Sequence, residues 1–377
     1  MGIKADTSFS LKDELFNADS VGELAGRLAE VLPRFRRAKF EREVLARFAD
    51  LELKERIAWI VTVLESYLPA AFPDARRALC DALPEPLNPT RTDDDFGKFI
   101  WVVPGEYVAK HGCEPEFIDE SLNFLREATK RFSSEGAIRP FLKRFPEQTL
   151  AFVHECTADT NYHVRRLASE GIRPLLPWAM RADVPVGSIL CVLDKLYADH
   201  TRYVTRSVAN TLNDISKTNP DRVIETLERW RQEGKQHDQE LRWMIRHALR
   251  TLLKQDYAAA LELLGYTTEP KFRLSKQRIS ETVAVGDSFE WRATLTSLAD
   301  QKLKVTLRIH YLKANGSLSA KVFAVRNGDF RKGESFEIVK RQPFRPVTTR
   351  TLYPGTHYAE LVVNGKSRRK RGFDLTG

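Results

Sequence analysis

Apolar residues in the first 266 positions recur at the spacing of amphipathic helices. Leu24, Leu28, Val31, Leu32 and Phe35 form one such face, at steps of three and four residues. Stretches of this kind are about 12 to 16 residues long, and short segments containing Pro, Gly or Asn separate them. The pattern predicts a helical region that extends to Tyr266.

The helical region repeats itself when the chain is shifted by 40 residues. Such a period, with two helices per unit, is typical of HEAT and armadillo repeats, whose helix pairs bury their apolar faces by stacking on neighbours. We therefore predict an α-solenoid of HEAT-like helical repeats, with residues 1–110, which fit the period poorly, as atypical terminal units. The aligned columns are Asp119, Asp159, Asp199 and Gln239; Phe124, Val164, Val204 and Met244; Arg126, Arg166, Arg206 and Arg246; Ala128, Ala168, Val208 and Ala248; Phe132, Ile172, Leu212 and Leu252.

Beyond Pro270 the pattern changes to the alternation of β-strands, as in residues 304–311. Turn signals such as Asn315-Gly316, Asn327-Gly328-Asp329 and Asn364-Gly365 separate the alternating runs. These short strands predict a C-terminal all-β immunoglobulin-like sandwich over residues 267–377, after a helical domain over residues 1–266. The sandwich contains no cysteine, which excludes the disulfide of antibody domains.

The composition is that of an ordinary globular protein, with 377 residues of which 42% are hydrophobic and 29% are charged. Four cysteines lie singly, the N-terminus carries no apolar stretch of the signal-peptide kind, and every apolar run is too short for a membrane span. We expect a cytoplasmic protein that does not enter the membrane.

Positive charge is concentrated in the C-terminal domain. Residues 267–377 contain 22 Lys and Arg against 10 Asp and Glu, a net charge of +12, whereas residues 1–266 contain 38 against 41, a net charge of −3. A basic domain of this kind favours a polyanionic partner such as a nucleic acid, although a basic surface is also compatible with simple solubility.

Several common chemistries lack their motifs in this sequence. There is no phosphate-binding glycine loop, no Cys/His set with zinc spacing and no Gly-x-Ser-x-Gly elbow. We therefore expect neither a cofactor nor a metal, and any reaction must use carboxylates, arginines and aromatic side chains.

The third repeat unit, residues 152–171, holds the densest set of polar and aromatic residues. Residues 159–161 are suited to cap the following helix, and a helix N-terminus attracts anions. Tyr162, His163, Arg165 and Arg166 lie in its first two turns, so the segment is a candidate seat for a phosphate group.

The same segment resembles a known family. Residues 165–174, Arg-Arg-Leu-Ala-Ser-Glu-Gly-Ile-Arg-Pro, followed by Leu176-Pro177-Trp178, are similar to the signature of AlkC DNA glycosylases. Further similarity lies in Phe99-Ile100-Trp101 with Tyr107 and Gly112, and in residues 133–136 with Arg139-Pro140. The resemblance covers nearly the whole chain, including the immunoglobulin-like domain that one subgroup carries.

The resemblance implies a monofunctional glycosylase that removes cationic bases such as 3-methyladenine and 3-methylcytosine from double-stranded DNA, without base flipping and as a monomer. A base methylated on a ring nitrogen is already a good leaving group. The enzyme therefore needs carboxylates that stabilise an oxocarbenium-like sugar and guide water. We favour Glu120 and Glu155 for this role, with Asp159 third. A helix-start acid at Glu120 and an N-cap at Asp159 are the structural alternatives.

The repeated arginines, Arg126, Arg166, Arg206 and Arg246, either follow a DNA backbone or form a structural ladder in which each arginine pairs with the repeated aspartate of the preceding unit. Aromatic side chains could contact deoxyribose or a cationic base, although most tryptophans of a solenoid belong to its core. In the β domain, residues 366–371 follow a turn and favour contact with the DNA backbone. The DNA-binding candidates are Trp101, Tyr162, His163, Arg165, Arg166, Trp178, Lys195, Arg202, Tyr203, Arg242, Arg368, Arg369, Lys370 and Arg371; Trp243 is a further aromatic candidate.

Two other functions fit the repeats. A non-catalytic HEAT scaffold could bind protein or nucleic acid, and a silent relative could sense damage without excising it. The two differ from a glycosylase in having no need to collect acidic and aromatic side chains on one surface.

Overall fold

The computed structural model describes residues 10–91, 96–346 and 351–377, and the chain divides into two compact units. Unit 1 comprises Met1–Thr218 and Arg229–Ala248. Unit 2 comprises Asn219–Glu228 and Leu249–Gly377.

Unit 1 is built from helices. Two short 3-10 helices, η1 (Phe48–Asp50) and η2 (Phe99–Trp101), accompany them, and the residues of α13 (Pro220–Glu233) are shared between the two units. The helices of unit 1 are α1 (Leu11–Leu15), α2 (Ala18–Val31), α3 (Arg37–Leu45), α4 (Leu53–Leu64), α5 (Phe72–Asp81), α6 (Val102–His111), α7 (Ile118–Ala128), α8 (Arg139–Arg144), α9 (Pro146–Cys156), α10 (Tyr162–Glu170), α11 (Val186–Leu196), α12 (Arg202–Ile215) and α14 (Asp238–Ala248).

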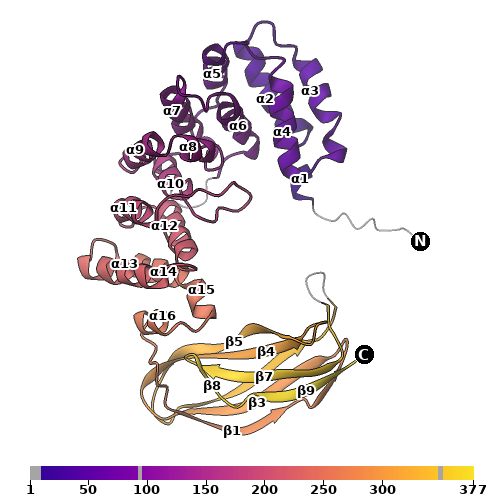
Figure 1. The fold of residues 1–377 in the computed structure, drawn as a ribbon, viewed down its shortest axis with the longest axis vertical. Coiled ribbons are helices and arrows are strands. Elements are labelled where there is room, and N and C mark those ends of the chain that lie inside the picture. Colours follow the sequence, from indigo (N-terminus) through magenta and orange to yellow (C-terminus); the bar gives the residue numbers. More distant parts are fainter. Residues whose placement is uncertain (1–9, 92–95, 347–350) are drawn as a thin grey trace. The chain divides into compact units, whose positions relative to one another are not determined.

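The predicted α-solenoid is confirmed by the way the repeated columns are buried. The column of Val164, Val204 and Met244 lies on α10, α12 and α14, and each of these side chains is fully buried. These three helices pack in succession, with α9 and α11 as the other layer (Figure 1). Phe124, aligned with the same column, is also buried, but it lies on α7, which packs against α5, α6 and α9, so the first unit departs from the predicted register. The period of 40 residues exists because each unit has to present the same apolar positions to its neighbours.

The repeated aspartates shape the turn before each inner helix. Asp159 Oδ1 accepts the backbone N–H of Asn161 at 2.8 Å, and Asp199 Oδ1 accepts that of Thr201 at 2.8 Å. Asn161 is the N-cap of α10, and its side chain accepts the N–H of His163. Short polar side chains are favoured here because they satisfy backbone donors that a helix start leaves unpaired.

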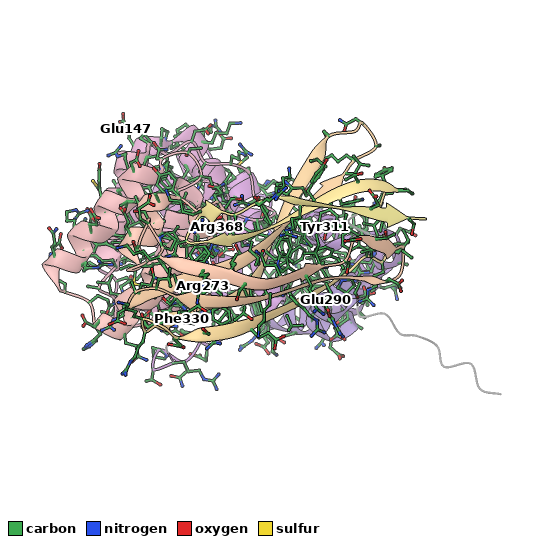
Figure 2. All side chains as sticks on the ribbon, turned by 90° about the horizontal axis from the view of Figure 1, so that it is seen from below. Glu147, Arg273, Glu290, Tyr311, Phe330 and Arg368 are labelled. Atoms are coloured by element: carbon green, nitrogen blue, oxygen red, sulfur yellow. The ribbon has the colours of Figure 1, made fainter. Side chains whose placement is uncertain are left out.

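Unit 2 contains the strands, which form two sheets with the orders β1-β3-β6 and β2-β9-β7-β4-β5; β8 pairs with β7. One apolar core joins them, and the rings of Phe289 on β3 and Phe373 on β9 meet across it at 4.4 Å. Tyr311 and Phe330, labelled in Figure 2, belong to the same core. The strands are β1 (Phe272–Ile279), β2 (Thr282–Ala284), β3 (Ser288–Ser297), β4 (Gln301–Leu312), β5 (Leu318–Phe330), β6 (Ser335–Pro343), β7 (Gly355–Val363), β8 (Lys366–Ser367) and β9 (Arg371–Thr376).

Two short helices, α15 (Arg250–Lys254) and α16 (Ala258–Leu263), belong to unit 2 as well. Asp256, between them, is bound by Lys304 at 2.6 Å and by Arg308 at 2.7 Å, both on β4. Lys302 also donates to the carbonyl of Leu264 at 2.7 Å. The last helix ends at Leu263 and the first strand begins at Phe272, whereas the compact unit around the strands already includes the chain from Leu249. A domain boundary at residue 266 stays a prediction.

Two features are absent from the described residues. No helix in them has the length and apolar character that crossing a membrane requires. The same residues contain no group of three or more His, Cys, Asp or Glu side chains arranged to hold a metal ion.

Candidate active site

A cavity of about 570 Å³ lies within unit 1, a size in the range of small-molecule sites. Its walls come from α4, from η2 and α6, from residues 132–136 between α7 and α8, and from residues 176–180 between α10 and α11. Most of the lining is apolar, and the charged side chains that face it are Lys54, Glu106, Lys110 and Glu135. Segments far apart in the sequence thus meet around one hollow.

Glu106 is the carboxylate that this cavity leaves without a partner. It lies on α6, is half-buried, and forms no hydrogen bond or ion pair among the described residues. Gly136 allows it close to the opposite wall, because a Cβ atom there would meet Glu106 Oε1 at 3.1 Å. Burial raises the pKa of the Glu106 carboxyl, and the positive charge of Lys54 opposes that rise. A raised pKa and a free carboxylate in a cleft are typical of a general base.

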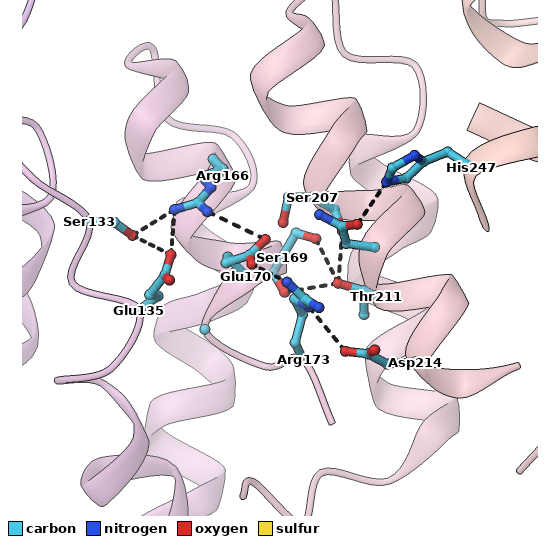
Figure 3. A network of polar contacts seen from close by, with 12 residues as sticks. Ser133, Glu135, Arg166, Ser169, Glu170, Arg173, Ser207, Thr211, Asp214 and His247 are labelled. Carbon is cyan, nitrogen blue, oxygen red and sulfur yellow. Dashed lines mark hydrogen bonds and ion pairs between the residues drawn. The ribbon is translucent and has the colours of Figure 1, made fainter. Parts of the chain in front are cut away.

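Glu135, in contrast, is held in place by two donors. Its Oε2 accepts from Arg166 Nη1 at 2.5 Å and from Ser133 Oγ at 2.8 Å. Ser133 Oγ in turn accepts from Arg166 Nη1 at 2.8 Å (Figure 3). This carboxylate has a fixed position and direction at the cavity wall, which suits it to stabilise positive charge without moving.

Arg166 is itself held by a chain of buried charges (Figure 3). Its Nη2 lies 3.6 Å from Glu170 Oε2, Glu170 pairs with Arg173, and Arg173 Nε donates to Asp214 at 3.1 Å. Burial raises the pKa of Glu170, but Arg166 and Arg173 outweigh this and hold it below its usual range. Arg166, Glu170 and Arg173 all belong to the family-like segment, so that segment builds the support of Glu135.

Trp178 lies at the edge of the same cavity with 67% of its surface exposed, which is unusual for tryptophan. Its backbone has a φ of 63°, in the left-handed region. The surrounding segment is fixed by the fully buried Arg139, which donates to the carbonyls of Gly171 at 2.8 Å and Arg173 at 2.9 Å and to that of Met180. An exposed indole on a rigid segment can stack on a flat or cationic ligand.

The structure places the three predicted catalytic carboxylates outside the lining of this cavity. Glu120 is 51% exposed and accepts from Arg76 Nε at 3.2 Å. Glu155 is exposed near the end of α9. Asp159 is 8% exposed and pairs with Arg126 at 2.5 Å. Their catalytic role stays a prediction, with Asp159 already engaged in a structural ion pair.

Most of the predicted aromatic contacts are core residues. Tyr162, His163 and Tyr203 are at most 5% exposed and form one ring cluster, with centroids of Tyr162 and His163 4.1 Å apart. Trp101 is 3% exposed, and its Nε1 donates to Glu23 at 3.2 Å. Trp178 differs from all of these because its indole is open to a ligand.

The predicted ladder exists, but its pairing differs from the predicted one. Arg126 binds Asp159, and Arg165 binds Asp199 at 2.5 Å, so each arginine pairs with the aspartate of the following repeat. Arg165, and not the aligned Arg166, is the ladder residue of the third unit.

The other predicted DNA-binding cations have different surroundings. Arg202 donates to Glu240 at 2.8 Å and lies 4.0 Å from the ring centroid of Trp243. Arg242 is 79% exposed beside Asp238, and Lys195 is exposed on α11. These residues remain candidates for phosphate contact.

In unit 2 the predicted basic run lies between β8 and β9. Arg368, Arg369 and Lys370 are exposed, whereas Arg371 is half-buried as the first residue of β9. Arg368 lies 4.3 Å from the ring centroid of Phe272, and Lys370 lies 4.7 Å from that of Tyr358. Figure 2 labels Arg368, which lies between β8 and β9, and Arg273 on β1. Contact of this run with DNA stays a prediction.

Sequence reasoning missed Glu106, Glu135 and Lys54. Glu135 lies within the family-like stretch 133–136, which was a usable signal. Glu106 lies in Pro104-Gly105-Glu106-Tyr107, between two quoted aromatic residues, with no charged neighbour to mark it. Lys54 carries no signal of its own, because its contact with Trp178 joins residues 124 positions apart.

Two family models match the chain. One is described as DNA alkylation repair enzyme and matches residues 124–252, and the other is described as the C-terminal Ig-like domain of the uncharacterised protein YhaZ and matches residues 273–377. The second match confirms the predicted immunoglobulin-like character of the C-terminal domain.

Two whole-length relatives agree with the family models. The uncharacterized protein YhaZ of Bacillus subtilis (strain 168) is 32% identical over 369 residues, which cover 96% of this chain and 98% of that protein. The Pseudomonas fluorescens alkylpurine DNA glycosylase AlkC, solved bound to DNA containing an abasic site analog, is 32% identical with a TM-score of 0.85. That match covers 98% of this chain and 100% of the other.

Proposed function

Because this chain belongs to the AlkC family of DNA alkylation repair enzymes, in the subgroup with an immunoglobulin-like domain, we propose that it excises cationic N-alkylated bases from double-stranded DNA. The proposed substrates are 3-methyladenine and 3-methylcytosine, released by hydrolysis of the N-glycosyl bond. The protein acts as a monomer in the cytoplasm and needs no cofactor. The observation that carries the proposal is the unpaired carboxylate of Glu106, facing a cavity beside the anchored carboxylate of Glu135.

The two carboxylates have different tasks in this proposal. Loss of the cationic base leaves positive charge on the deoxyribose, and the fixed carboxylate of Glu135 stabilises that charge without reorganising. Glu106 removes a proton from the attacking water, since its raised pKa gives a carboxylate basic enough to accept it. The oxygen of that water forms the new bond to C1′ as the bond to the neutral, departing base breaks. Only water is consumed.

Trp178 supplies recognition of the lesion in this proposal. An indole face attracts a cation by roughly 0.5 to 2 kcal/mol, and an uncharged base lacks this term. The base stays within the duplex, as the family resemblance implies. A 2-aminopurine placed beside the lesion tests this, because its fluorescence stays low while the neighbouring bases remain stacked and rises when a base is extruded.

The decisive experiment measures release of both methylated bases by the purified protein and by four glutamine variants. Glu106→Gln and Glu135→Gln probe the cavity, and the predicted alternatives Glu120→Gln and Glu155→Gln are matched controls that keep the same change of charge. We expect Glu106→Gln to lower the excision rate about 100- to 10,000-fold, with binding to DNA containing an abasic site analog retained.

Each other outcome selects a different function. If Glu120→Gln or Glu155→Gln abolishes excision while the cavity variants stay active, the originally predicted carboxylates are the catalytic ones. If the unmodified protein binds DNA and releases neither base at any enzyme concentration, a damage sensor or a HEAT scaffold replaces the glycosylase.

A further inference from the structure

Lys54 is linked both to Trp178 and to the cavity that Glu106 lines. It lies at the start of α4, and its Nζ donates to the backbone carbonyl of Trp178 at 2.6 Å. The same side chain lines the cavity that Glu106 faces. One ammonium group therefore contacts the segment that presents the indole and acts on the unpaired carboxylate.

The hydrogen bond from Lys54 fixes the backbone of Trp178, a non-glycine residue in the left-handed conformation. Arg139 fixes the carbonyls of Gly171, Arg173 and Met180, on either side of Trp178, and Lys54 fixes the carbonyl of Trp178 itself. A non-glycine residue in the left-handed region costs about 1 kcal/mol or more, so it persists where surrounding bonds impose it. Without Lys54, the indole would lose the bond that fixes its own peptide group.

Trp178 and Lys54 also line a second hollow. This hollow of about 520 Å³ is lined by both residues together with Leu53 and residues 10–12. Leu53, Lys54 and Trp178 are the lining residues that the two hollows share.

Lys54 also affects the charge of Glu106. The other charged groups that line the cavity with Glu106 are Lys54 from α4, Lys110 from its own helix α6, and Glu135 from residues 132–136. Lys110 is engaged by Glu65 at 2.5 Å, and Glu135 by Arg166. Lys54 has no carboxylate partner among the described residues. Its positive charge lowers the Glu106 pKa, although burial of Glu106 raises that pKa by more.

We infer that Lys54 is a positioning residue of the proposed active site, which fixes the Trp178 peptide at the cavity edge and places a positive charge in the cavity that Glu106 lines. The inference rests on the proposed glycosylase function for its consequence on rate. The hydrogen bond from Lys54 to Trp178 and the effect of the Lys54 charge on Glu106 can both be tested without measuring enzymatic activity.

The test compares Lys54→Met, which removes the charge and the donor, with Lys54→Arg, which keeps both. Lys39→Met is the matched control, since Lys39 is an exposed lysine of α3 that pairs with Glu43. Each variant is made with Glu106 and again with Glu106→Gln, so that the effect of the carboxylate is obtained as a difference.

The first readout is the melting temperature at several pH values. A group whose folded pKa is raised contributes stability below its unfolded pKa, near 4.3 for Glu, and loses it as the pH rises through the folded value. The difference in melting temperature between Glu106→Gln and its parent should therefore be more positive near pH 8 than near pH 4. In the Lys54→Met background, adding Glu106→Gln should raise the melting temperature near pH 8 by a larger amount. In the Lys54→Arg and Lys39→Met backgrounds the increase should equal that in the unmodified protein.

The second readout is tryptophan fluorescence anisotropy, with the Trp178 signal obtained by subtracting the matching Trp178→Phe variant. We expect Lys54→Met to lower the anisotropy of this signal, because the indole moves more freely, and Lys54→Arg to restore it. The third readout is the dependence of base release on pH. Lys54→Met should lose more of the excision rate at the acidic end of the pH profile than at the alkaline end, because loss of the Lys54 charge raises the pKa of Glu106 further.

An unchanged anisotropy in Lys54→Met, or an unchanged gain in melting temperature on adding Glu106→Gln, overturns the inference. Failure of Lys54→Arg to recover either property does the same. If the unmodified protein releases no base, the proposed function fails while the first two readouts still decide the role of Lys54.

Discussion

Replacing Arg166 by methionine tests whether the buried charge chain holds Glu135. The Arg166 side chain is 14% exposed, and the change removes its bonds to Glu135 and Ser133 and its approach to Glu170. Breaking a buried ion pair costs about 3 to 5 kcal/mol. Glu135 is 30% exposed and Glu170 keeps Arg173, so we expect a loss of about 2 to 4 kcal/mol.

The assay is thermal unfolding followed by the circular dichroism of the helices at 222 nm, which reports on unit 1. A domain of this size shifts by about 2 to 4 °C per kcal/mol, so Arg166→Met should melt about 5 to 15 °C lower. Arg242→Met, in which the replaced arginine is 79% exposed, is the matched control and should change stability by less than about 0.5 kcal/mol.

A double-mutant cycle with Glu135→Gln completes the test. If the pair acts as described, the double variant loses less than the sum of the two single losses, by about 1 to 3 kcal/mol. Additive losses would refute the reasoning, because Arg166 would then stabilise the fold without holding Glu135. A loss below about 1 kcal/mol in Arg166→Met would refute it more directly.

Three further predictions concern other parts of the chain. Gly112→Ala should destabilise the protein by more than about 2 kcal/mol in chemical unfolding, because the new Cβ would lie 2.2 Å from Phe72 Cζ; an unchanged midpoint would show that the helices shift freely there. Asp256→Asn, which removes a buried partner of two cations, should lower the melting temperature of the β domain by several degrees, and near-ultraviolet circular dichroism measures this. At pH 8 a disulfide reagent should label the exposed Cys191 first and spare Cys156, whose pKa burial raises to about 12; equal rates would contradict this.

The fold was largely predictable because the sequence repeats its own core. Val164, Val204 and Met244 lie 40 residues apart, and the structure buries all three in equivalent places. Repetition of this kind reports packing between neighbouring units, which depends on residues close in sequence. The change from period 3.6 to period 2 near residue 266 was readable for the same local reason.

The candidate site was less predictable because it depends on contacts between distant segments. Glu120 and Glu155 occupy related places near helix ends, and that regularity made them candidates. Glu106 has no such regularity, since its environment comes from Gly136 and from a segment that Lys54 ties down across 124 residues. The choice between Arg165 and Arg166 as the ladder residue likewise depended on how far each side chain reaches into the next repeat.

The two short helices that belong to unit 2 affect where the chain can be cut into separately folding parts. Asp256 and Leu261 pack against the turn at Gly365, where a Cβ atom would lie 3.2 Å from Asp256 and 3.5 Å from Leu261. A deletion that removes only the strands would leave these helices with a buried acid and an apolar face stripped of their cover. The unit that belongs together therefore comprises residues 219–228, most of which lie in α13, together with α15, α16 and the strands, and a cut made only before the first strand would divide it.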